Sequence, residues 1–160
     1  MKFEVNVQGR IGGGRTRQRV RLFCRQVLQD AIKRPEFHFL KRKSEISLAF
    51  LIATRSQSKT LNRSFRKKPK PAGVLAFPVY RTLAELRATH SPAIELGDIV
   101  ICPAVIRKEA RLAGREFYAQ FFWMILHGIL HVLGYDHERS AGERARMEAL
   151  EGEILGRFHR

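Results

Sequence analysis

Apolar and polar residues follow one another along this chain in patterns that predict both strands and helices. Alternation near the start, and short apolar runs further on, are typical of β-strands. These patterns predict strands at residues 3–7, 45–52, 74–77 and 98–102. Pro78 and Pro103 directly follow the last two runs and are expected to end them.

Apolar residues at helical spacing predict the remaining elements. Helices are expected at about 16–33, 56–65, 116–133 and 141–158, with a connecting helix or turn at 83–91. The helix at 116–133 is apolar nearly all round, so we expect it in the core together with Trp123 and its phenylalanines. Three glycines at 12–14 are expected to break the chain. Strands interleaved with helices predict a single α/β (α+β) domain over residues 1–160.

The charge of the chain changes this picture. Thirty Lys and Arg against fifteen Asp and Glu give a formal net charge of +15 in 160 residues. Such basicity indicates a polyanionic partner, either nucleic acid or an anionic membrane surface, and the bland alternative is a solvated basic surface. The arginines of the helix at 16–33 have the same two interpretations, phosphate contact or a solvated face.

A membrane role is disfavoured. No run approaches the ~18 apolar residues that a spanning helix needs. Residues 1–10 lack the apolar core of a secretory signal, so we expect a cytoplasmic protein with no membrane partner. In a reducing compartment, Cys24 and Cys102 are expected to be free buried thiols.

Three histidines carry the chemistry of the chain. His127 and His131 are four residues apart, so on a helix their rings project from one face. Gly134 can end that helix in a left-handed conformation and let the chain carry His137 to the same point. Three converging imidazoles indicate one metal ion, most plausibly Zn²⁺, with a fourth position open for water, as in a catalytic site. Ordinary histidines on an apolar helix are the alternative.

The spacing of these histidines equals that of metzincin peptidases, H-E-x-x-H-x-x-G-x-x-H. The glutamate that serves those enzymes as general base is replaced here by Gly128, which cannot take a proton. The pattern therefore keeps the metal ligands and lacks the peptidase base.

The stretch 127–137, His-Gly-Ile-Leu-His-Val-Leu-Gly-Tyr-Asp-His, resembles the signature HGxLHLxGYDH of the YbeY family of metal-dependent endoribonucleases. Further segments agree in order from about residue 44 to the C-terminus. They are Leu61-Asn62 with Phe65-Arg66, Val74-Leu75 with Phe77-Pro78, and Leu96-Gly97-Asp98-Ile99. Where the family has Thr-Asp or Thr-Asn before Val-Leu-Ser, this chain has Ala72 and Gly73, and Ala76 stands for the serine. Three hydrogen-bonding side chains are thereby lost next to the expected cleft.

The resemblance implies a small mixed sheet of three parallel strands and one antiparallel strand, packed with helices around a central metal-bearing helix. It implies endonucleolytic cleavage of single-stranded RNA with one Zn²⁺ per chain. The implied setting is maturation of bacterial ribosomal RNA, chiefly the 3′ end of the small-subunit RNA, and ribosome quality control. The implied partners are ribosomal RNA, the small ribosomal subunit and its proteins.

Roles can then be assigned to single residues. His127, His131 and His137 are expected to hold the metal, and Arg66 to bind the scissile phosphate, unless it only pairs with a surface carboxylate. The basic loop after Arg66 is expected either to hold the RNA backbone or to be simply solvated; its cations are Lys67, Lys68 and Lys70.

The general base is not assigned. Asp98 is expected either to orient a ligand or to sit at a strand end for structural reasons, and Asp136 to stabilise the turn after Gly134. Two rival functions stay open. The charge also suits a non-catalytic RNA-binding ribosome-assembly factor with a structural zinc, and the histidine spacing also suits a zinc peptidase.

Overall fold

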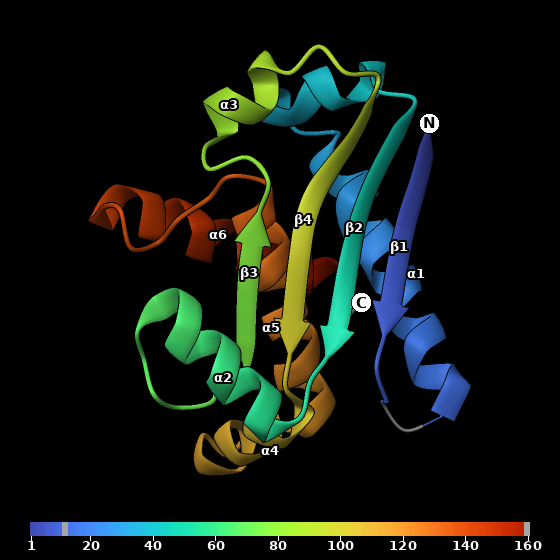
Figure 1. Ribbon diagram of the computed structural model, residues 1–160. Coiled ribbons are helices and arrows are strands. Elements are labelled where there is room, and N and C mark those ends of the chain that lie inside the picture. Colours follow the sequence, from blue (N-terminus) through green and yellow to red (C-terminus); the bar gives the residue numbers. More distant parts are fainter. Residues whose placement is uncertain (11–12, 159–160) are drawn as a thin grey trace.

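The computed structural model describes residues 1–10 and 13–158, and within them Figure 1 shows one sheet with helices packed mainly behind it. Its strands, in order across the sheet, are β1 (Lys2–Gln8), β2 (Glu45–Ile52), β4 (Ala93–Ile101) and β3 (Val74–Pro78). β1, β2 and β4 run parallel, and β3 pairs antiparallel with β4 at the edge. The predicted α+β class and its mixed sheet are confirmed.

The helices that the structure describes are α1 (Gly13–Ala31), the 3₁₀ helix η1 (Pro35–Arg42), α2 (Arg55–Arg66), α3 (Leu83–Ala88), α4 (Pro103–Leu112), α5 (Phe117–Val132) and α6 (Ala141–Phe158). The helices expected from the sequence are all present. Within the described residues, none of them is both long and apolar enough to cross a membrane.

The 3₁₀ helix η1 was not predicted from the sequence, and the structure differs from the sequence pattern in three further places. Gly13 and Gly14 do not break the chain but open α1, whereas Gly12 lies outside the described residues. β4 begins at Ala93, five residues before the predicted strand, and runs through Gly97. α4 was not predicted, because Pro103 was interpreted as the end of a strand although proline is also favoured in the first turn of a helix.

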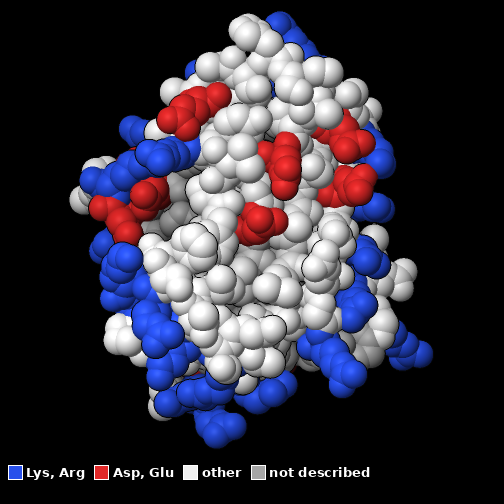
Figure 2. Space-filling view, in the orientation of Figure 1, with Lys and Arg blue, Asp and Glu red and all other residues white. Residues whose placement is uncertain are grey.

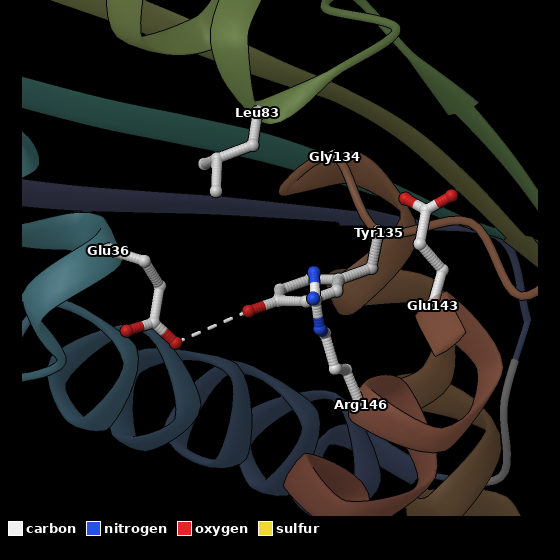
Figure 3. A pocket seen from close by; sticks show the side chains of 6 residues that line it. All are labelled: Glu36, Leu83, Gly134, Tyr135, Glu143 and Arg146. Atoms are coloured by element: carbon white, nitrogen blue, oxygen red, sulfur yellow. Dashed lines mark hydrogen bonds between the residues drawn. The ribbon is translucent and has the colours of Figure 1, made fainter.

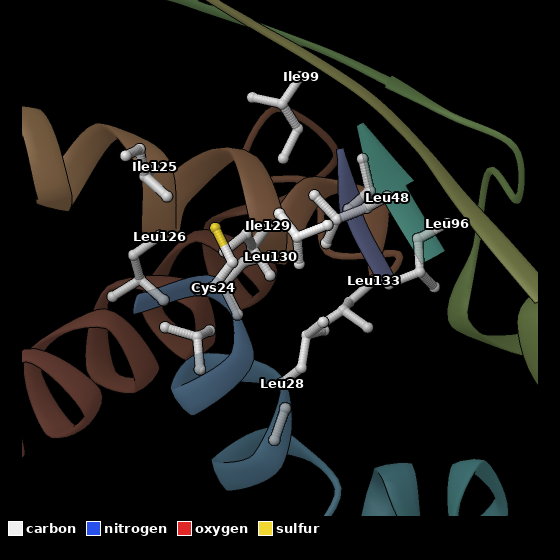
Figure 4. Packing of buried hydrophobic residues seen from close by; sticks show 14 of the residues in the cluster. Cys24, Leu28, Leu48, Leu96, Ile99, Ile125, Leu126, Ile129, Leu130 and Leu133 are labelled. Atoms are coloured by element: carbon white, nitrogen blue, oxygen red, sulfur yellow. The ribbon is translucent and has the colours of Figure 1, made fainter. Parts of the chain in front are cut away.

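The main core lies between the covered face of the sheet and two helices, α1 and α5. In Figure 4, Ile125 and Ile129 of α5 lie among side chains from the sheet and from α1. Both Ile125 and Ile129 are fully buried, as expected for a central helix. Cys24 and Cys102 are free buried thiols, as predicted, and burial raises the pKa of the Cys24 thiol.

A smaller apolar cluster lies on the opposite face of the sheet and brings α2 to it. Leu61 of α2 packs against Leu75 and Val100 there. α2 starts at a capping box, in which Thr54 accepts a hydrogen bond from the backbone of Gln57 and the Gln57 side chain accepts one from the backbone of Thr54. The helix is thus fixed at its start and along one side, which sets the position of its last residue, Arg66.

Candidate metal centre

The turn that ends α5 is built as the sequence predicts. Gly134 has φ +103°, a conformation that residues with a side chain rarely adopt. Its N–H donates to the carbonyl of His131 at 3.0 Å, and the N–H of Tyr135 donates to the carbonyl of Leu130 at 3.0 Å. These two bonds make a Schellman motif, which reverses the chain directly after the helix.

The structure brings the three histidines together. His127 and His131 lie one turn apart on α5, and the turn at Gly134 returns His137 to them. One nitrogen from each ring lies within 4.8 Å of the others, and the side chains are half-buried. The two Nε2 atoms of His127 and His131 are 3.1 Å apart. The predicted convergence of the three rings is therefore present.

These nitrogens suit a metal ion. Two ligands of a tetrahedral zinc with bonds of about 2.0–2.1 Å lie about 3.3 Å apart, close to the Nε2–Nε2 distance. The pKa of His131 is lowered to about 4, first by burial and then by His127 and His137, so this ring is neutral at pH 7 and offers a lone pair. Nδ1 of His137 is buried and has no hydrogen-bond partner among the described residues. The donor set fits a borderline metal such as zinc.

Tyr135 anchors the turn to η1. Its hydroxyl donates to Oε1 of Glu36 at 3.3 Å, across a cavity of about 370 Å³ that Gly134 and Leu83 also line (Figure 3). Burial, and then Glu36, raise the pKa of Tyr135 to about 12, so the phenol stays protonated and keeps donating at neutral pH. The turn that leads to His137 is therefore tied both to α5 and to η1.

Arg66 lies beside the histidine cluster. Its Nη2 pairs with Oε1 of Glu138, the residue after His137, at 2.8 Å. The two side chains are 39% and 58% exposed, so the pair is open to solvent. A hollow of about 380 Å³ next to it is lined by His137, Glu138 and Arg144 of α6, among others. The cluster thus has an arginine and open space at its rim.

The basic loop after Arg66 has a fixed backbone and exposed side chains. Lys67 ends α2 with φ 58°, and its N–H donates to the carbonyl of Asn62. The buried Asn62 side chain in turn donates to the carbonyl of Lys70 at 2.7 Å. Lys67, Lys68 and Lys70 are all exposed. Their charges are therefore presented to solvent from a defined position.

The structure gives the two acidic candidates, Asp98 and Asp136, different surroundings. Asp98 is exposed on β4, on the face opposite to the one on which the neighbouring Ile99 meets α5, so it does not orient a histidine. Asp136 accepts a hydrogen bond from the N–H of Glu138 at 2.9 Å and stabilises the turn, as predicted.

A Cβ on Gly128 would lie 2.8 Å from Cγ2 of Ile99, so this position faces the sheet.

The space beside Gly73 is occupied. A Cβ on Gly73 would lie 3.0 Å from Oε2 of Glu109 and 3.0 Å from Cε of Met124. Burial raises the pKa of Glu109. The backbone of Ala72 is held by Ser58, whose hydroxyl both donates to its carbonyl and accepts from its N–H. The start of β3 is thus tied down without the side chains that the family pattern has there.

Two residues next to the centre, Glu151 and Trp123, were not predicted from the sequence to be part of it. Glu151 of α6 lies with its Oε1 2.5 Å from Nδ1 of His127, and its Oε2 accepts from Nε1 of Trp123 at 3.1 Å. The sequence does contain a signal for Glu151. This residue lies in the apolar stripe of α6, between Leu150 and Ile154, where a carboxylate is rarely found. Only the partner on α5, 24 residues away, was beyond the reach of a local pattern.

Together, the fold and the three imidazoles define an α+β domain with a candidate metal centre at the end of its central helix. A family model described as Endoribonuclease YbeY matches residues 14–159. The chain therefore belongs to the endoribonuclease YbeY family.

Curated relatives agree with this assignment. The Endoribonuclease YbeY of Bartonella bacilliformis is 44% identical over 112 residues, which cover 70% of this chain and 66% of the relative. That of Chromohalobacter salexigens is 42% identical over 118 residues, covering 72% and 70%. Among solved structures, the solution structure of TM1509 from Thermotoga maritima matches with a TM-score of 0.57 at 20% identity, covering 97% of this chain and 91% of the other. At that identity the likeness concerns the fold alone.

Proposed function

We propose that this chain is a metal-dependent endoribonuclease that cleaves single-stranded RNA with one Zn²⁺ held by His127, His131 and His137. The observation that carries the proposal is the convergence of the three ring nitrogens within 4.8 Å, with Arg66 at the rim. The endoribonuclease names of its relatives support the reaction class.

The proposed mechanism divides the work between two elements. Bound zinc supplies Lewis acidity toward a phosphoryl oxygen and activates water. The three imidazoles of α5 and its terminal turn would hold the ion. Arg66 on α2 binds the scissile phosphate, because its planar fork matches phosphate oxygens and its charge offsets the charge that develops during cleavage.

The side chain of Arg66 is held only weakly by its ion pair with Glu138. An exposed ion pair such as Arg66–Glu138 stabilises a fold by about 0–1 kcal/mol. An incoming phosphate can therefore displace Glu138 at little cost. Until then the pair keeps the guanidinium at Glu138, the residue after His137, so a bound phosphate would lie beside the three histidines.

The charge distribution supports a path for RNA along the edge of the molecule. In Figure 2, Lys and Arg follow the left, lower and right margins of the visible face, whereas the middle carries acidic and uncharged groups. The exposed acidic residues of the open sheet face include Glu4, Glu95 and Asp98. Phosphates avoid such a face, and we assign backbone contacts to Lys67, Lys68 and Lys70 beside Arg66.

The biological setting is part of the proposal. The family supports a role in ribosomal RNA processing, and we extend it to the 3′ end of the small-subunit RNA and to ribosome quality control. The partners would be the small ribosomal subunit and its proteins in the bacterial cytoplasm.

Cleavage of an end-labelled single-stranded RNA by wild type, His131→Ala and Arg66→Glu tests the proposal. We expect His131→Ala to lose both zinc and cleavage. Arg66→Glu should keep one zinc and lose cleavage by about 100-fold or more, because a carboxylate repels the phosphate. Arg55→Glu makes the same charge change at the other end of α2 and should leave cleavage close to wild type. RNA binding without cleavage by the wild type would instead favour the assembly factor.

A further inference from the structure

Glu151 is a buried acidic group whose position needs a reason. It is only 5% exposed, and its neighbours in the stripe, Met147, Leu150 and Ile154, are buried apolar residues. A carboxylate there is costly unless its charge and lone pairs are satisfied. Both of its oxygens are in fact engaged, one by His127 and the other by Trp123.

The contact with His127 determines which ring nitrogen is free. A carboxylate is a hydrogen-bond acceptor, so the 2.5 Å contact favours the His127 tautomer that carries its proton on Nδ1. In a neutral ring the lone pair is then on Nε2. Nε2 is the atom that lies 3.1 Å from Nε2 of His131, inside the cluster.

We propose that Glu151 is the positioning residue of the metal centre: it fixes the ring of His127 with Nε2 aimed at the metal and, through its charge, strengthens that nitrogen as a ligand. Carboxylates that accept from the distal nitrogen of a ligating histidine do this in metal sites generally. The inference rests on the proposed metal function and adds a residue from α6 to a site otherwise built on α5, its terminal turn and α2.

Trp123 completes the arrangement. Its indole lies one turn before His127 on α5, with ring centroids 5.9 Å apart, and its N–H holds Oε2 of Glu151. Each of the two carboxylate oxygens thus has its own hydrogen-bonding partner on α5. Trp123→Phe removes the hydrogen bond to Oε2 and leaves the contact of Oε1 with His127, which makes it a control for a purely structural role of the same carboxylate.

Zinc affinity of the apo protein, measured by competition with a chromophoric chelator, tests the proposal without any RNA. The variants are Glu151→Ala, Glu151→Gln, Trp123→Phe and, on the exposed side of α6, Glu153→Gln. We expect both changes at Glu151 to weaken zinc binding by about 10–100-fold, with Ala the weaker binder. Trp123→Phe should stay within about threefold of wild type, because the contact between Glu151 and His127 is intact. Glu153→Gln should match wild type.

The readouts separate positioning from folding. Far-UV circular dichroism and the Tm of the apo variants report the fold, and the visible spectrum of bound Co²⁺ reports the ligand geometry. If Glu151 only joined α5 to α6, its substitution would lower the apo Tm and leave the zinc affinity and the Co²⁺ spectrum unchanged. That result would overturn the proposal. If Glu151→Ala does not fold, Glu151→Gln, which keeps the volume, decides the question.

The fate of the two proposals can be told apart. A wild type that binds one zinc but cuts no RNA would refute the endoribonuclease mechanism, and weaker zinc binding by the Glu151 variants would still support the positioning role. A wild type that binds no zinc would overturn both.

Discussion

Replacing Gly134 by alanine tests the turn on which the candidate metal centre depends. The residue has φ +103°, and an added Cβ would lie 2.5 Å from the backbone nitrogen and 2.9 Å from Cα of Leu83. These atoms are backbone, so they cannot move aside as a side chain could. A left-handed conformation costs an L-residue roughly 1–2 kcal/mol, and overpacking typically costs about 1–3 kcal/mol. We therefore expect Gly134→Ala to lower the free energy of unfolding by about 2–5 kcal/mol.

Thermal unfolding of the apo protein measures this effect. For a chain of this length, 1 kcal/mol corresponds to about 2–4 °C in Tm, so the expected fall is about 4–20 °C. Gly152→Ala is the matched control, because Gly152 lies exposed in α6 with no atom within 4 Å of an added Cβ. Alanine is favoured over glycine within a helix by about 0.5–1 kcal/mol, so this variant should be slightly more stable than wild type.

The variant also links the turn to metal binding. If alanine distorts the turn, His137 moves away from the two histidines of α5, and zinc binding weakens in whatever fraction of the protein remains folded. A Gly134→Ala protein within about 0.5 kcal/mol of wild type, the range of an unremarkable surface change, would refute the argument from conformation and close packing.

Three further outcomes follow from the structure. Ser58→Ala should lower the free energy of unfolding in urea by about 1–3 kcal/mol, because it leaves both the N–H and the carbonyl of Ala72 without their partner; an unchanged midpoint would mean that water replaces the hydroxyl. Thr54→Ala should cost about 0.5–2 kcal/mol through loss of the capping box, whereas Thr60→Ala, exposed within the same helix, should change stability by less than about 0.5 kcal/mol. Zn²⁺ at 100 times its Kd should stabilise the apo protein by about 2.7 kcal/mol; a chelator should reverse the rise in Tm, and His131→Ala should show none.

The parts of the molecule that the sequence predicts well are those set by local spacing. Helix α5, the i, i+4 histidines and the helix-ending Gly134 all lie within a few residues of one another, so a pattern of 3.6-residue period contains their geometry. The same holds for α6, whose bounds the apolar spacing predicts to the residue.

The features that the sequence did not predict depend on how distant segments pack together. The strand predicted at 98–102 begins earlier, at Ala93, and includes Gly97 at φ +139°, next to the irregularity in its pairing with β2. A Cβ there would lie 2.2 Å from the carbonyl oxygen of Phe77, so the glycine is required by the neighbouring strand. The contact of Glu151 with His127 is likewise decided by how α6 packs on α5, which no periodicity contains.

Position 128 shows why the same histidine spacing does not imply peptidase chemistry. A Cβ on Gly128 would lie 2.8 Å from Cγ2 of Ile99 and 3.2 Å from Cγ2 of Val74, both on the sheet. A glutamate there would force these side chains or the helix to shift, and its carboxylate would start toward the core. The glycine therefore allows close packing between helix and sheet. The same packing sets the distance of α5, and so of His127 and His131, from the sheet. A centre built this way must take its charged helpers from other elements, and the structure offers Arg66 from α2 at the open side and Glu151 from α6 at the buried side.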